Sequence, residues 1–129
     1  MATFTLFITS SPNSTDLHAA AIAFARTALE KGHSIKRVFF YGDAVFSGLA
    51  TQQPPQGQES TLALWQAFKN EFDTGLQACI ANSLRRGVAD LRESHRYALD
   101  AVTLAKSFEL CGLGEMAEAF NDSDRVIHF

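Results

Sequence analysis

Hydrophobic residues recur along the chain with two alternating spacings, one typical of strands and the other of helices. Short runs rich in β-branched and aromatic residues predict five strands, over residues 3–9, 35–41, 75–80, 107–111 and 124–129. Apolar positions at helical spacing predict helices over residues 16–31, 59–72, 90–106 and 115–120. Because strands and helices alternate, we predict an α/β fold: a single-domain, three-layer α/β/α arrangement with a mainly parallel five-stranded sheet.

The segment from Gly42 to Gly57 follows neither spacing and is punctuated by glycine and proline, which predicts a long loop. Its apolar stretch, Ala44-Val45-Phe46, is expected to be exposed unless another chain covers it. Loops of this length in compact domains often form lids or partner surfaces. Two interpretations therefore stand: a segment that docks on another chain, or a tolerated surface excursion.

Cys79 stands near the end of an apolar run, and a polar, doubly basic turn follows it. Asn82 or Ser83 can cap a helical turn there, which would place the thiol where a strand passes into a helix. Unpaired backbone N–H groups and the guanidinium groups of Arg85 and Arg86 would favour the thiolate at such a junction. The thiolate is the form of cysteine that attacks sulfur, accepts sulfur and binds soft metals.

Two interpretations of Cys79 compete. Free cysteine is among the most buried residue types, so an isolated cysteine in an apolar run is usually a small core side chain. In open parallel sheets, however, functional sites lie beyond the carboxyl ends of the strands, where Cys79 and the loops after Thr9 and Tyr41 would gather. This placement favours a functional thiol. Cys111 also has two interpretations, a buried strand cysteine or a resolving partner for Cys79.

Composition narrows the class of protein. With 129 residues, 47% of them hydrophobic and 19% charged, the chain is expected to form one globular domain over residues 1–129. A net charge of -3 argues against tight, sequence-independent binding of nucleic acid, so a partner would have to hold any RNA. The N-terminus lacks the basic region of a signal peptide, and no apolar run reaches membrane-spanning length. We therefore expect a cytoplasmic protein with no membrane contact.

No motif for a metal or an organic cofactor is present. The two cysteines lie more than thirty positions apart and form neither a CxxC motif nor a zinc site. Gly112-Leu113-Gly114 matches neither of the common phosphate-binding glycine motifs. The histidines lack metal-ligand spacing and are expected to be solvated or to lie at an interface. These four residues are His18, His33, His95 and His128.

Several short segments, in their order and spacing, resemble the DsrE family over essentially the whole chain. The segments are Val38-Phe39-Phe40-Tyr41, Cys79 followed by Leu84-Arg85-Arg86-Gly87-Val88, Gly112-Leu113-Gly114 with Ala117-Glu118-Ala119, and Asp124-Arg125-Val126-Ile127-His128-Phe129.

The resemblance implies a sulfurtransferase subunit of the sulfur relay for tRNA 2-thiouridine synthesis. The reactive cysteine of the family matches Cys79, which is expected to accept sulfane sulfur from a TusA-like donor as a persulfide and to pass it to a TusE-like acceptor. TusB-like and TusC-like sister subunits are expected to assemble with the chain into a heterohexamer, a dimer of heterotrimers. The chain would meet tRNA only indirectly. Such transfer requires an exposed cysteine and protein contact, but no metal or organic cofactor.

Three alternatives stay open at this point. The related DsrE subunits serve sulfur oxidation with the same chemistry, and sequence physics does not choose between the two pathways. After tRNA thiolation and sulfur oxidation, the third interpretation is a non-catalytic assembly subunit. The presence of a cysteine at position 79 argues against it. Arg85 and Arg86 could steady a persulfide anion or contact a partner.

Overall fold

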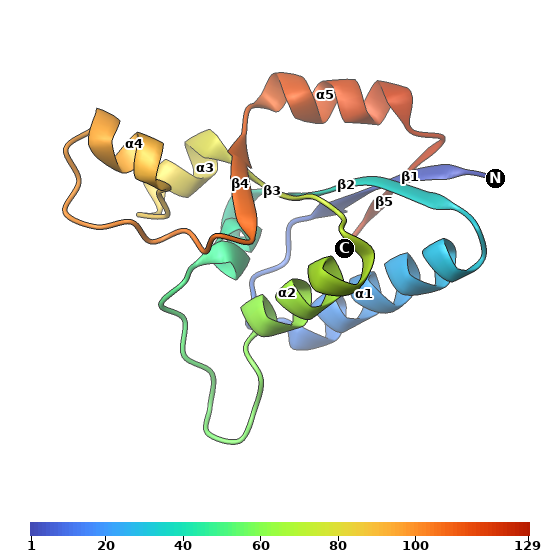
Figure 1. Ribbon diagram of the computed structural model, residues 1–129, viewed down its shortest axis with the longest axis horizontal. Coiled ribbons are helices and arrows are strands. Elements are labelled where there is room, and N and C mark those ends of the chain that lie inside the picture. Colours follow the sequence, from blue (N-terminus) through green and yellow to red (C-terminus); the bar gives the residue numbers. More distant parts are fainter.

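Five strands form one sheet in the computed structural model, which describes residues 1–129 (Figure 1). The strands are hydrogen-bonded in the order β4-β3-β2-β1-β5, and every neighbouring pair is parallel. The predicted α/β fold is confirmed, and each predicted strand is present with its ends within one residue of the expected positions. The strands are β1 (Thr3–Ile8), β2 (Ser34–Phe40), β3 (Leu76–Cys79), β4 (Phe108–Cys111) and β5 (Arg125–His128).

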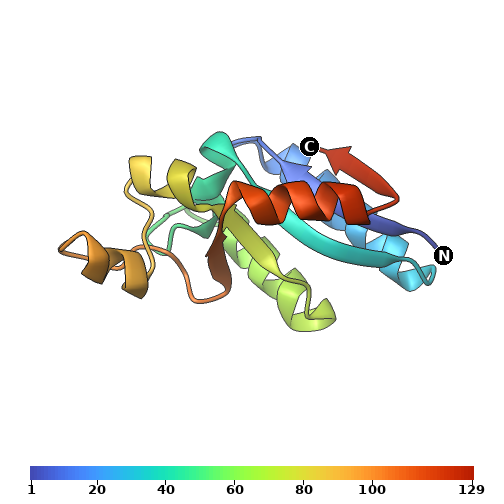
Figure 2. The ribbon, with the colours of Figure 1, turned by 90° about the horizontal axis from the view of Figure 1, so that it is seen from above.

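Helices cover both faces of the sheet, because parallel strands must be joined by crossovers that pack on one face or the other. α1 (Thr15–Glu30) and α2 (Thr61–Phe72) lie under one face, and α5 (Leu113–Asp122) lies across the other (Figures 1 and 2). Two shorter helices, α3 (Ile80–Arg85) and α4 (Leu91–Arg96), project beyond the sheet on the side where β3 ends. None of the helices has both the length and the apolarity needed to cross a bilayer.

The core lies mainly between the sheet and the helices α1 and α2. Trp65 of α2 is fully buried and meets the ring of Phe40 edge to face, with 5.2 Å between the ring centroids. Phe68, one turn further along α2, packs on Trp65 in the same way at 5.8 Å. Each large apolar side chain buried in this manner contributes about 1.5–3 kcal/mol to the stability of the fold.

His18 is buried inside this layer, whereas its spacing in the sequence predicts a solvated or interfacial histidine. Its Nδ1 accepts a hydrogen bond from Trp65 Nε1 at 2.9 Å. Its Nε2 lies 3.0 Å from the carbonyl oxygen of Ser10 and 3.2 Å from that of Ser11, so Nε2 carries the proton and donates. Burial lowers the pKa of His18 although both carbonyls favour the protonated ring. The neutral ring therefore ties the loop after β1 to α1 and α2.

The lowered pKa of His18 predicts that the protein loses stability in mild acid. The unfolded chain binds a proton near the ordinary pKa of 6.5, and the folded chain binds it only at lower pH. The stability that the neutral ring provides is therefore complete above about pH 7 and declines as the pH falls below the unfolded value. We expect urea midpoints, followed by Trp65 fluorescence, to fall between about pH 7 and about pH 5. His18→Gln should lower the midpoint at pH 7 and flatten this dependence; an equally steep fall in the variant would contradict the assignment.

The segment after β2 differs from the predicted loop. Residues Gly42–Gly48 form a 3-10 helix, η1, in which Ala44 and Val45 are fully buried in the core rather than exposed. The side chain of Gln52 closes the turn after η1 by donating to the carbonyl oxygens of Phe46, Ser47 and Leu49. Ala44 and Val45 stand in a glycine-rich segment whose local sequence gives only a weak indication of a helix. They turn inward because the sheet and α2 leave space for them in the core.

The helix predicted over residues 90–106 is wrong beyond Arg96, where α4 ends. Ala98 adopts a left-handed conformation with φ of 52°, and Leu99 N–H donates to the carbonyl oxygen of Ser94. The Ser94 hydroxyl then donates to the carbonyl oxygen of Ala101 at 2.8 Å. Thr103 connects back to Gly87 and Ala89 through its hydroxyl. These long-range hydrogen bonds replace the helical ones, which apolar spacing by itself could not indicate.

At Gly48, the backbone of η1 lies close to the side chains of the segment that leads into β4. Ala105 N–H donates to the Gly48 carbonyl oxygen at 2.8 Å, and a Cβ at position 48 would lie 2.9 Å from Leu104 Cδ1 and 3.0 Å from the Phe108 ring. Gly48→Ala should therefore lower the free energy of unfolding by about 1–3 kcal/mol in urea denaturation. The matched control is Gly114→Ala in α5, where nothing lies within 4 Å of the added Cβ and the helix should gain up to about 1 kcal/mol. Equal stabilities of the two variants would contradict the tight contact.

Candidate functional site

Cys79 lies at the junction that the sequence predicts. It is the last residue of β3 and the N-terminal capping residue of α3, with φ of −59° and ψ of 121°. Asn82 and Ser83, however, lie inside α3 and do not cap it; α3 has no side-chain cap. Asn82 instead accepts a hydrogen bond from Gly42 N–H at 2.6 Å, which ties α3 to the start of η1. The helix begins earlier than predicted because the chain turns directly after the strand ends.

The thiol of Cys79 is fully buried, whereas sulfur transfer led us to expect an exposed cysteine. Its register partner in the neighbouring parallel strand is Cys111, the last residue of β4. Register partners in a parallel pair project to the same face, about 4.7–4.9 Å apart. Phe39 of β2 projects to this face and so does Phe7 of β1, which meets Phe120 of α5. Both cysteines therefore lie on the sheet face that α5 covers. Neither forms a disulfide.

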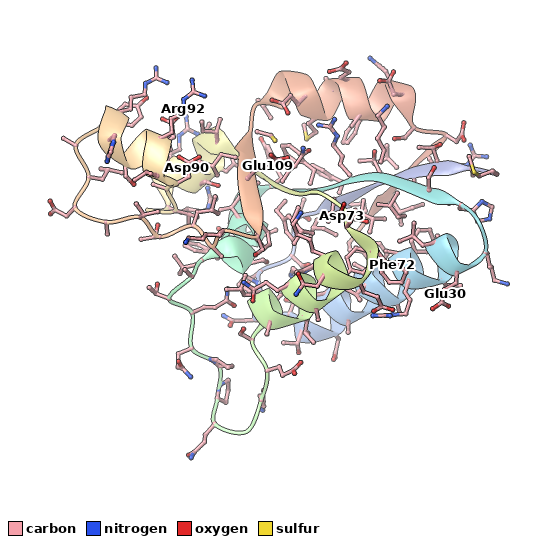
Figure 3. The ribbon with its side chains drawn as sticks, in the orientation of Figure 1. Glu30, Phe72, Asp73, Asp90, Arg92 and Glu109 are labelled. Carbon is pink, nitrogen blue, oxygen red and sulfur yellow. The ribbon has the colours of Figure 1, made fainter.

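Charged side chains gather around Cys111 on this face. Gln77 Nε2 donates to Glu109 Oε1 at 2.7 Å, and Glu115, in the first turn of α5, lies 3.8 Å from Arg37 Nη1. Figure 3 shows Glu109 on β4. Burial, followed by the carboxylates of Glu115 and Glu109, raises the pKa of Cys111 to about 12, while Arg37 acts in the opposite direction. Cys111 is therefore a thiol at neutral pH, which favours the buried strand cysteine over the resolving partner.

The two arginines after Cys79 differ in environment. Arg86 Nε donates to Asp43 Oδ1 at 2.9 Å, and Arg86 Nη1 donates to the carbonyl oxygen of Asn82 at 3.0 Å. Arg86 thus connects α3 to η1. Arg85 is exposed, forms no ion pair and lines an apolar groove. Arg86 is therefore engaged in contacts within the chain, which neither of its two predicted roles included, whereas Arg85 is exposed and unpaired.

The loops at the carboxyl edge are only partly brought together. The loop after Tyr41 adjoins α3 through the hydrogen bond from Gly42 to Asn82. The loop after Thr9 leaves the same edge, but its hydrogen bonds lead to α1 and α2: His18 holds Ser10 and Ser11, and the Thr61 hydroxyl donates to the Pro12 carbonyl oxygen at 2.6 Å. No group of three or more His, Cys, Asp or Glu side chains is arranged to hold a metal ion.

Sequence reasoning missed one feature near Cys79. A groove of about 380 Å³ is lined by Ala81, Leu84 and Arg85 of α3 and by Tyr97 and Leu99. Tyr97 and Leu99 fall within the helix predicted over residues 90–106, and they line the groove because α4 ends at Arg96. Apolar spacing carries no signal for this turn, which hydrogen bonds such as that from Ser94 to Ala101 determine.

The environment of Cys111 predicts slow alkylation that depends on Glu115. Glu115→Gln removes a carboxylate beside the thiol, lowers the pKa of Cys111 and should accelerate its reaction with iodoacetamide at each pH between about 7 and 9.5, because only the thiolate reacts. The measurement is peptide mapping by mass spectrometry. The matched control is Glu118→Gln, an exposed glutamate one turn further along α5 that should leave the rate unchanged. Identical rate profiles for wild type and Glu115→Gln would contradict the assigned influence.

These features define a three-layer α/β protein with a cysteine at the carboxyl edge of a parallel sheet, and the comparisons agree with this class. The chain belongs to the DsrE/DsrF-like family, whose model matches residues 2–129. The sulfurtransferase TusD homolog of Vibrio cholerae is 36% identical over 98% of this chain and 97% of that protein. A protein of Allochromatium vinosum that carries the name DsrE is 35% identical over 98% of this chain and 97% of its own length.

The fold is also that of another protein of known structure. The crystal structure of the ychN protein from E. coli superimposes over all of both chains with a TM-score of 0.73 at 20% sequence identity. At this sequence identity, the similarity concerns the fold alone. The curated relatives place the chain among the sulfurtransferases of the family.

Proposed function

We propose that this chain is the persulfide-carrying subunit of a sulfur relay, in which Cys79 accepts sulfane sulfur from a TusA-like donor and passes it to a TusE-like acceptor for tRNA 2-thiouridine synthesis. The observation that carries the proposal is the position of Cys79, at the end of β3 in a chain whose full-length relatives include sulfurtransferases named TusD. A purely structural subunit has no need of a cysteine at this edge.

The transfer consists of two thiol–persulfide exchanges. The Cys79 thiolate attacks the outer sulfur of the donor persulfide; a new S–S bond forms at Cys79, the donor S–S bond breaks, and the donor leaves as a thiolate. The acceptor thiolate then attacks the outer sulfur on Cys79 and releases the Cys79 thiolate. Each step conserves atoms and electrons, so neither an oxidant nor an organic cofactor is needed.

The buried state of Cys79 adds a requirement to this mechanism. A donor sulfur must reach an atom that has no exposed surface in the isolated chain. α3 has only six residues and is joined to η1 by the Asn82–Gly42 and Arg86–Asp43 hydrogen bonds. A protein that contacts α3 can displace these few bonds, whereas β3 is held on both sides by β2 and β4. Exposure of Cys79 upon docking is therefore part of the proposal.

The proposed assembly has TusB-like and TusC-like sister subunits in a dimer of heterotrimers, in the cytoplasm, with tRNA held by a later partner. The net charge of -3 supports an indirect contact with tRNA, because a chain that binds a polyanion by itself is usually basic. Sulfur oxidation is the second candidate pathway, supported by the relative named DsrE at nearly the same identity. Both pathways use the same chemistry at Cys79.

The proposal predicts that Cys79 is the only residue that gains sulfur. After incubation with a persulfidated TusA-like donor in the presence of the sister subunits, intact-protein mass spectrometry should show the addition of one sulfur atom to wild type and to Cys111→Ser. Cys79→Ser should show none, because an alcohol does not form a persulfide. Cys79→Ala is the second variant, since a buried hydroxyl without a partner can cost about 1–3 kcal/mol of stability.

Trp65 fluorescence verifies that each variant is folded. Sulfur gain by folded Cys79→Ala would refute the assignment to Cys79. Absence of sulfur gain in every form, with the donor and sister subunits present, would instead favour a non-catalytic assembly subunit.

A further inference from the structure

Apolar side chains remain exposed on the part of the molecule that follows Cys79. We call residues 80–102, with α3 and α4, the α3–α4 extension; it projects beyond the sheet in both views (Figures 1 and 2). Half of the large apolar side chains that the chain leaves exposed belong to it. They are Leu91 at 60% exposure, Tyr97 at 54%, Leu99 at 47% and Val102 at 49%. Such a concentration on one short segment is typical of an interaction surface.

The exposed residues are held in place rather than left on a loose loop. Asp90 caps α4 by accepting from Glu93 N–H at 2.8 Å, and the Ser94 hydroxyl donates to the carbonyl oxygen of Ala101. Ala50 N–H donates to the Thr103 carbonyl oxygen at 2.7 Å, which attaches the end of the extension to the chain after η1. The groove of about 380 Å³ between α3 and the Tyr97–Leu99 turn is therefore a preformed feature.

Arginine is concentrated in the α3–α4 extension, which holds four of the eleven Lys and Arg residues of an acidic chain, although the exposed Asp100 follows Leu99 directly. Arg85 lines the groove, and Arg92 is exposed on α4 (Figure 3); neither forms an ion pair. Arg96 is more than half exposed and lies 3.9 Å from Glu93, whose own side chain is buried. The free guanidinium groups thus favour a partner that carries carboxylates beside apolar side chains.

The groove is also close to the reactive thiol. Ala81, Leu84 and Arg85 belong to the six-residue helix that begins immediately after Cys79, so they lie about 3–9 Å further along the helix axis. A segment seated in the groove would contact the same helix whose displacement exposes Cys79. Binding in the groove and access to the thiol are therefore coupled through α3.

We propose that the groove of the α3–α4 extension is the docking site for an acidic, amphipathic segment of the acceptor protein that takes sulfur from Cys79. Apolar side chains of that segment pack against Leu84, Tyr97 and Leu99, and its carboxylates face Arg85 and Arg92. The inference rests on the proposed function for the identity of the partner, and on the groove, the exposed apolar residues and the free guanidinium groups for its location.

The test compares two exposed leucines in a binding assay with the fluorescently labelled TusE-like acceptor of the same genome. Leu99→Ser should weaken binding about tenfold, as expected for a centrally placed apolar contact. The matched control is Leu17→Ser in the first turn of α1, outside the α3–α4 extension and with the same 47% exposure, which should bind like wild type. Equal binding by both variants, or no binding by wild type, would overturn the proposal.

Charge reversal tests the second half of the recognition. Arg92→Glu should weaken binding at low ionic strength, and this effect should diminish in high salt. Arg125→Glu, an exposed arginine on β5 at the opposite edge of the sheet, is the control that should change little. An equal effect of both reversals would indicate nonspecific electrostatics and would contradict the docking site.

Sedimentation of the same variants distinguishes the acceptor from the other proteins that could occupy the groove. Leu99→Ser could release the TusB-like or TusC-like subunits, or abolish self-association of the chain, without weakening acceptor binding. In that case the groove is a subunit interface and the proposal fails. Loading of wild-type Cys79 by the persulfidated TusA-like donor, with the sister subunits present, is measured independently. Loading without groove-dependent binding refutes only the docking site, and absence of loading refutes the proposed function.

Discussion

The common direction of the strands is the constraint on which the site depends. β3 is hydrogen-bonded between β2 and β4, and all three run in the same direction, so their carboxyl ends meet at one edge of the sheet. Cys79 is the last residue of the middle strand, and its place is therefore set by the sheet rather than by the short α3 that follows. A reactive atom on a rigid strand end, followed by a helix with few tethers, combines a fixed position with adjustable access.

Cys79 and Cys111 are both cysteines at strand ends, but they differ in the groups that surround them. Cys79 and Cys111 are register partners on one face of the sheet, and both are buried. Burial and the carboxylates of Glu115 and Glu109 disfavour a thiolate at Cys111, whereas Cys79 is the residue from which α3 starts. A neutral neighbour is compatible with a persulfide carrier, because a second thiolate within reach could attack the inner sulfur and release sulfide.

The α3–α4 extension joins the thiol to the surface of the molecule. Arg86 and Asn82 fasten α3 to η1, while Arg85 and Tyr97 remain available at the groove. The same short helix therefore lines the groove, follows directly on Cys79 and contacts η1. In the proposed relay, a partner would be selected by this surface, which it must contact before it reaches the thiol.

The sequence by itself determined the strands, the alternation that leads to an α/β fold, the strand-end position of Cys79 and, through resemblance, the family. These features depend on local spacing and on short motifs, which a single chain displays. Only the tertiary structure decided that Ala44 and Val45 turn into the core, that α4 ends at Arg96, that His18 is buried and that Cys79 is covered. Each of these depends on contacts between distant segments, such as Trp65 with His18 or Thr103 with Gly87, whose hydrogen bonds and burial outweigh local preference.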